Sequence, residues 1–229
     1  MLKKTILILL ALPPCTSVAV ASDLNAIATL TSEYIYRGLA LSDGNPALQF
    51  GVDYEHDSGF FVGAWASTID LYSRFGQRDM ELDFYAGFNY AAKKSWQASL
   101  TVLRYTYPGE TGSHSYAYNE LLLAASVGEH FSLELGYTND LYGLDRIGRH
   151  WEVRTEWPVA GAWMIGAALG GNDMSDLNTP HYLHWDVGAS ARLSRFTFDP
   201  RWYDNEPAGG PASAFSAGSR IVFAVSVAL

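Results

Sequence analysis

Acidic and basic side chains recur at every second position along several segments of this chain, and two of these segments also carry histidine. His150 stands two residues before Glu152, and His184 stands two residues before Asp186. Residues two apart in a strand share a face, so each pair could bring an imidazole beside a carboxylate and transfer protons in a hydrolytic site. The chain contains neither a G-x-S-x-G nor an H-E-x-x-H motif. We therefore expect these residues to be polar wall residues and predict no enzymatic activity.

Binding of a divalent cation by loop acids is a second chemistry to consider. The acidic clusters at Asn139-Asp140 and at 172–176 lack the spacing of a calcium loop. Aspartate and asparagine at such positions commonly form turns. The single cysteine, Cys15, lies in an N-terminal segment that we expect to be removed, which leaves no thiolate for a metal or a disulfide. We predict neither a metal site nor a cofactor.

The element that must position the charged residues is a strand with one apolar and one polar face. In the clearest copy, Met80, Leu82 and Phe84 alternate with Glu81 and Asp83. The pattern recurs about twelve times and predicts twelve strands. Their expected ranges are 26–37, 46–56, 60–69, 79–91, 95–107, 115–128, 131–139, 149–160, 162–171, 181–193, 195–204 and 217–229.

The connections between these strands alternate between short and long. The short ones are 56–59, 92–94, 128–130, a turn around 160–161, and 194. The long ones, rich in Gly, Asp, Asn, Ser and Pro, are 38–45, 70–78, 108–114, 140–148, 172–180 and 205–216. An even number of strands, with short turns at one end and long loops at the other, is typical of outer-membrane barrels.

The two faces of the predicted strands favour the same fold. Leu, Val, Phe and Ala occupy one face, and we expect aromatic residues to form two belts at the strand ends, as at the two interfaces of a bilayer. The belt near the short turns comprises Tyr54, Phe60, Phe88, Tyr90, Trp96, Phe131, Trp157, Trp163, Phe196 and Phe198. The belt near the long loops comprises Tyr34, Tyr36, Tyr107, Tyr137, Trp151, Tyr182 and Trp202. A shift in the alternation after Val102 predicts a bulge there.

The alternative to an outer-membrane barrel is a soluble barrel or sandwich, which would bury the apolar face of its strands in a core.

The first residues have the pattern of an export signal. Lys3 and Lys4 precede a short apolar run, Thr5–Leu12. Ala19-Val20-Ala21 has the small residues that surround a cleavage site, so we expect removal of residues 1–21. Residues 22–229 then form a single barrel domain. A lipid anchor on Cys15 is disfavoured because Pro14 stands where a small residue is needed.

The composition excludes two classes of protein. The chain has 15 basic and 24 acidic residues; without the two lysines of the signal, 13 basic residues remain and the formal charge falls from −9 to −11. So acidic a chain does not bind nucleic acid through its phosphates. No apolar run of 18 residues follows the signal, which predicts no transmembrane helix. A membrane-spanning chain without such a helix must be a closed barrel.

Several stretches carry a family resemblance, and they are densest in residues 32–67. They are Ser32–Gly38, Leu41–Gln49, Asp53-Tyr54, Ser58–Phe60, Gly63–Ser67, Tyr105–Gly109, Glu120 and Tyr137–Asp140. In order and spacing they resemble the TorF-like porins, small exported proteins of Gram-negative bacteria. The resemblance implies an outer-membrane β-barrel and a channel, but it supplies no substrate and no site residues. Such barrels usually end in an aromatic residue, whereas this chain ends in Leu229. The alternation before it retains the rest of the signal for the barrel-assembly machinery.

Charged residues on the inward face are the candidates for function, because charges in a confined lumen select which ions enter. The candidates are Glu33, Arg37, Asp53, Glu55, Glu81, Asp83, Glu120, Glu134, Glu152, Arg154, Glu156, Asp186 and Arg192, with Asp199, Arg201 and Arg104 as further possibilities. Acids predominate among them. We therefore predict an antiparallel, up-and-down transmembrane β-barrel of the outer membrane that passes small neutral or cationic solutes.

Two other hypotheses stay open at this point. In the first, arginine–carboxylate pairs plug the lumen and the barrel has a structural or surface-interaction role. In the second, less favoured, the barrel is a hydrolase. The expected partners are outer-membrane lipid, the assembly machinery, and small solutes or cations, with no nucleic acid; the sequence leaves the oligomeric state open.

Overall fold

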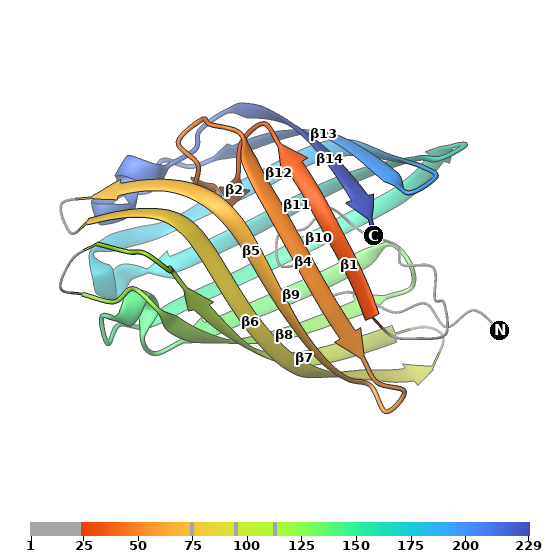
Figure 1. The fold of residues 1–229 in the computed structure, drawn as a ribbon, viewed down its shortest axis with the longest axis horizontal. Coiled ribbons are helices and arrows are strands. Elements are labelled where there is room, and N and C mark those ends of the chain that lie inside the picture. Colours follow the sequence, from red (N-terminus) through yellow and green to blue (C-terminus); the bar gives the residue numbers. More distant parts are fainter. Residues whose placement is uncertain (1–23, 74–75, 94–95, 112–113) are drawn as a thin grey trace.

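Twelve antiparallel strands close into a barrel in the computed structural model, which describes residues 24–73, 76–93, 96–111 and 114–229 (Figure 1). The strands of the wall are β1 (Leu24–Thr31), β4 (Ala47–Glu55), β5 (Phe60–Ser73), β6 (Gly76–Lys93), β7 (Trp96–Thr106), β8 (Tyr118–Val127), β9 (Phe131–Thr138), β10 (Gly148–Ala160), β11 (Trp163–Met174), β12 (Thr179–Leu193), β13 (Phe196–Asn205) and β14 (Arg220–Ala228). Each strand pairs with its neighbours in the chain, and β1 pairs with β14 to close the ring. The predicted fold is confirmed. The expected signal peptide, residues 1–21, lies outside the described residues.

The polarity of the barrel is the reverse of that of a soluble protein. Leu48 and Phe50 on β4 are 60% and 46% exposed, whereas Glu81 and Asp83 on β6 are each 1% exposed. Apolar side chains cover the outside in this way on strand after strand, while most of the charged side chains of the wall strands are on the inside. Only an apolar medium stabilises such an outer face, which is the arrangement of a transmembrane barrel.

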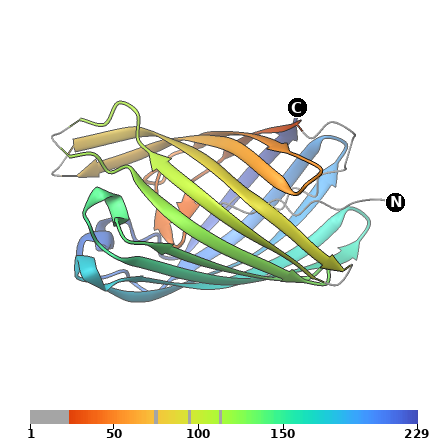
Figure 2. The same ribbon diagram turned by 90° about the horizontal axis from the view of Figure 1, so that it is seen from below.

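Turn lengths distinguish the two ends of the barrel. The chain turns tightly between β4 and β5 and between β8 and β9, where Gly59 and Gly128 adopt φ values of +93° and +64°. β1 begins and β14 ends at this same end (Figures 1 and 2). The opposite end carries longer connections, three of which contain the short 3₁₀ helices η1 (Leu141–Gly143), η2 (Ser175–Leu177) and η3 (Gly210–Phe215). No helix among the described residues is both long and apolar enough to cross a membrane.

Two segments predicted as long loops are largely strand. β5 continues to Ser73 and β6 begins at Gly76, so most of 70–78 belongs to the wall, with a bulge between Thr68 and Leu71. Similarly, most of 172–180 belongs to β11 and β12. The polar composition of these segments predicted loops. Polar residues can also form paired strands at the end of the barrel, because a strand needs no apolar face there.

The predicted bulge after Val102 is wrong. β7 pairs continuously with β6 from Leu82↔Thr106 to Ala91↔Gln97, and with β8 from Trp96↔Val127 to Tyr105↔Tyr118. Leu103 is completely buried inside, and Arg104 is on the exposed outer side. The alternation only seemed to shift because the interior at this level is apolar.

The first strand is shorter than predicted, because the chain leaves the wall of the barrel after Thr31. Two short strands, β2 (Ile35–Tyr36) and β3 (Leu39–Ala40), then pair with each other inside the barrel. We call residues 34–41 the inner hairpin. Its two-residue turn, Arg37-Gly38, has φ values of +50° and +77°, which are characteristic of a type I′ hairpin turn.

Candidate functional site in the barrel lumen

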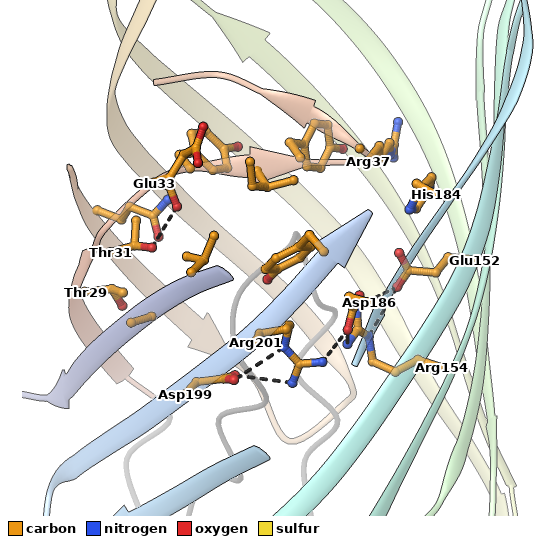
Figure 3. A pocket seen from close by; sticks show the side chains of 18 of the residues that line it. Thr29, Thr31, Glu33, Arg37, Glu152, Arg154, His184, Asp186, Asp199 and Arg201 are labelled. Carbon is orange, nitrogen blue, oxygen red and sulfur yellow. Dashed lines mark hydrogen bonds and ion pairs between the residues drawn. The ribbon is translucent and has the colours of Figure 1, made fainter. Parts of the chain in front are cut away.

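The inner hairpin crosses the lumen and its tip is bound to the far wall (Figure 3). The carbonyl oxygen of Arg37 accepts hydrogen bonds from Asn172 Nδ2 of β11 at 3.2 Å and from Tyr182 Oη of β12 at 3.0 Å. The carbonyl oxygen of Gly38 accepts one from Ala217 N at 3.0 Å. These bonds satisfy the main chain of the tip, so the hairpin is an ordered part of the interior.

The side chain of Arg37 binds a third part of the wall. Its two terminal nitrogens donate to the two carboxylate oxygens of Glu120 on β8, at 2.9 and 3.1 Å. Tyr105 Oη also donates to Glu120, at 2.7 Å, and Tyr36 Oη lies 2.7 Å from Tyr105 Oη. Bidentate, charge-assisted pairs of this kind are among the strongest polar contacts in proteins. Arg37 therefore fastens the hairpin between β8 on one side and β11–β12 on the other.

We expect Gly38→Ala to release the hairpin tip. An alanine Cβ at this position would lie 2.8 Å from His184 Cβ and 3.0 Å from Asn205 Cβ, in addition to the strain of a positive φ. Trypsin cleaves after arginine, so cleavage at Arg37, followed by mass spectrometry, reports release. The control is Gly44→Ala, which has a similar φ of +78° but no atom within 4 Å of its Cβ. Equal cleavage rates in the two variants would contradict the docked position of the tip.

Aromatic rings fill the space between the hairpin and strands β5–β8. Tyr34 packs on Trp65 with ring centroids 5.4 Å apart, and Tyr105 stacks on Tyr118 at 4.5 Å. Arg78, whose side chain is buried, lies 3.8 Å from the centre of the Tyr116 ring. This half of the interior is closed by side chains, and Glu81 and Asp83 are buried behind them.

The predicted aromatic belt near the long loops is partly wrong. Tyr34, Tyr107 and Tyr182 are buried, and Tyr36 is half-buried, all inside the barrel. Tyr137 and Trp202 do remain exposed on the outside, as do all ten members of the predicted belt near the short turns. Tyrosine suits an interface and a polar interior equally well, so residue type alone could not separate the two positions.

The other half of the interior contains a cavity of about 90 Å³ beneath the hairpin. An ion-pair network lines it: Arg154 Nη2 lies 3.1 Å from Glu152 and 3.0 Å from Asp186. Arg201 also binds Asp186, and its Nε lies 3.4 Å from Asp199 (Figure 3). The cavity is large enough for several water molecules.

Apart from Arg104, each predicted lumen residue within a strand lies on the inner side of the alternation. Tyr85 donates to Asp53, and Asn89 Nδ2 donates to Glu55 at 3.0 Å. Of the predicted residues, those that line the cavity are Glu33, Arg37, Glu134, Glu152, Arg154, Asp186, Asp199 and Arg201. Asp53, Glu55, Glu81, Asp83, Glu120, Glu156 and Arg192 lie elsewhere on the inner wall or within the filled half. Arg104 is outside. Sequence reasoning missed Arg78, because it fell in a predicted loop. It also missed the uncharged lining residues Thr29, Thr31 and Gln49. Their alternation with Leu30 and Leu48 would have identified them.

The two histidine pairs do not form the arrangement considered from sequence. His150 Nε2 lies 3.4 Å from Glu134 on the neighbouring strand β9. Among the residues that the structure describes, no group of three or more His, Cys, Asp and Glu side chains is placed to hold a metal ion.

A closed twelve-stranded antiparallel barrel with an apolar outside and a charged inside defines a transmembrane β-barrel of the outer-membrane type. The chain belongs to the Gcw_chp family, bacterial proteins of unknown function, whose family model matches residues 17–226. No curated protein matches the chain in sequence.

Solved structures share the fold. The KdgM porin in complex with disordered oligogalacturonate is 9% identical with a TM-score of 0.55, over 89% of this chain and 98% of that chain. The COG4313 outer membrane channel from Pseudomonas putida F1 is also 9% identical, with a TM-score of 0.53, over 94% and 98% of the two chains. At this identity the likeness establishes the architecture, which in both proteins is that of an outer-membrane channel.

Proposed function

We propose that this protein is an outer-membrane channel, of the kind called TorF-like porins, through which small neutral or cationic solutes diffuse. The inner hairpin narrows the passage, and the cavity beneath it is lined from β1, β4, β9, β10, β12, β13 and β14. The observation that carries the proposal is the excess of acid around the cavity. Five acidic residues line it, Glu33, Glu134, Glu152, Asp186 and Asp199, against three arginines, Arg37, Arg154 and Arg201.

Charge and size together define the class of solute. Charges in a narrow lumen are weakly screened, so an excess of carboxylate favours cations and opposes anions. The KdgM structure is described with oligogalacturonate, an acidic sugar chain. The acidic lining of the present lumen is unsuited to such a ligand, whereas the cavity of about 90 Å³ has room for an ion with several waters.

The proposal is tested by planar-bilayer recording of the refolded protein, which is expected to show small, cation-selective currents. Replacing Glu134 and Glu152 together by glutamine should shift the reversal potential toward anions. These two acids are directly paired between β9 and β10, with side chains 19% and 23% exposed. Asp145→Asn, in an exposed loop, removes charge without touching the cavity and serves as the control. Anion selectivity of the unmodified protein would overturn the proposal.

A second candidate is a non-conducting barrel with a structural or surface-interaction role. The ion pairs that span part of the lumen, Arg37–Glu120 and those of Arg154 and Arg201 with Asp186, favour it. A measurement of conductance distinguishes the channel from the non-conducting barrel. A barrel that conducts neither in its native form nor after its hairpin is released has no transport function.

The remaining assignments follow from the channel proposal. The apolar outer wall would contact outer-membrane lipid after export through a signal removed at residue 21 and insertion by the barrel-assembly machinery. In the lumen, the residues proposed to govern permeation are those around the cavity and Arg37, whereas Glu81 and Asp83 lie behind the aromatic cluster.

A further inference from the structure

Two buried polar atoms around the cavity lack hydrogen-bond partners among the residues that the structure describes. Neither Glu33 Oε1 nor His184 Nε2 has a hydrogen-bond partner among the described residues. The two residues are 7% and 5% exposed, and both line the cavity (Figure 3). Buried polar atoms are nearly always paired, so each exception calls for an explanation such as a bound ion or water.

The register of three strands explains the position of His184. Gly170 of β11 pairs with Glu152 of β10 on one side and with His184 of β12 on the other. A Cβ on Gly170 would collide with His184 Nε2, so the imidazole lies over the glycine. The ring therefore lies toward β10, the strand that carries Glu152. The missing side chain of Gly170 creates a place where imidazole and carboxylate flank the same space.

The positive charges near the cavity are already engaged. Arg37 is held by Glu120, Arg154 by Glu152 and Asp186, and Arg201 by Asp186 and Asp199. Glu33 has a single cationic neighbour among the described residues, Arg220 Nε, at 3.4 Å from its other oxygen. With five acids and three arginines, the lining keeps a formal charge of −2.

We propose that this cavity, whose wall includes Glu33, Glu152 and His184, binds a small monovalent inorganic cation that keeps part of its water shell. The cavity of about 90 Å³ accommodates an ion with a few waters. The described part of the chain offers no three-ligand metal cluster, which favours contacts through water over direct coordination. Such binding is weak enough for release, as conduction requires. The site would account for the cation preference proposed above. Its role in permeation rests on the channel proposal, but binding of the cation can be measured without it.

The test is thermal unfolding of the refolded barrel in detergent, followed by its heat-dependent migration on a gel. Potassium chloride is compared with choline chloride at equal ionic strength, since the charge of choline is surrounded by methyl groups and cannot hold the inner shell of water that the site would bind. Binding to the folded state alone should raise the unfolding midpoint by about 3 °C in potassium. Glu33→Gln and Glu152→Gln should each abolish most of this difference. Asp57→Asn, in an exposed turn, should retain it.

The outcomes separate the site from the channel. Equal midpoints in the two salts for the unmodified protein overturn the site, and so does a potassium effect that survives in both variants. Two separate variants are used so that a folding defect in one leaves the other to decide. A potassium effect that both variants lose, in a barrel that carries no current, supports the site and removes the channel.

Discussion

Arg37→Ala is expected to raise the conductance of the barrel several-fold. The substitution removes both hydrogen bonds to Glu120 and with them the link between the inner hairpin and β8. The main-chain bonds of the tip to Asn172, Tyr182 and Ala217 and the hydroxyl contact between Tyr36 and Tyr105 remain, but the ion pair that anchors the tip to the opposite wall is gone. Displacement of the hairpin would join the cavity to the long-loop end. Single-channel recording in planar bilayers measures the effect.

Two further variants serve as controls for the conductance of Arg37→Ala. Arg37→Ala leaves Glu120 buried without its ion-pair partner, so the double variant Arg37→Ala/Glu120→Gln removes the unpaired charge as well. It should conduct at least as well as the single variant. Arg149→Ala removes a guanidinium that is 56% exposed and paired with Asp173 at the outside of the barrel, and should leave the conductance unchanged. If the double variant conducts no better than the native barrel, the hairpin is not the constriction.

Asp186→Ala is expected to cause the largest loss of stability. Asp186 binds both Arg154 and Arg201, and its side chain is 4% exposed. Its removal leaves two buried guanidinium groups short of a carboxylate, and breaking a buried pair in this way costs about 3–5 kcal/mol of the free energy of unfolding. For a chain of this size the midpoint should fall by roughly 6–20 °C. The heat-dependent gel shift in detergent records it.

The matched control for this loss is Asp79→Ala. Asp79 is exposed and accepts a hydrogen bond from Gln77 at 2.7 Å. A surface substitution of this kind should change the free energy of unfolding by no more than about 0.5 kcal/mol. If Asp186→Ala and Asp79→Ala unfold at the same temperature, the network of Arg154 and Arg201 does not stabilise the barrel.

The sequence was sufficient for the wall of the barrel because alternation is a local signal. Each inward position on β4, for example, could be assigned from the apolar neighbours Leu48 and Phe50 on either side. The same argument placed Glu120, Glu134, Glu152 and Asp186 inside. It failed where the interior itself is apolar, as at Leu103, because a buried leucine and a lipid-facing leucine look alike in sequence.

The inner hairpin was beyond such reasoning. Residues 32–37 continue the alternation of β1, so pattern alone extended the strand along the wall. What turns the chain inward is a set of distant partners, Glu120, Asn172, Tyr182 and Ala217, which no local pattern reveals. The pairing of Arg154 with both Glu152 and Asp186 likewise depends on the register between strands.

The place of the inner hairpin in the chain has a consequence for the order of assembly. The hairpin follows β1, yet its tip is bound to residues 135 to 145 positions later in the chain. β1 also forms the closing seam with β14. Contacts of such long range are slow to form, since the chain between them must first be in place. Although it follows directly on β1, the hairpin therefore reaches its native position only after β11 and β12 are in place.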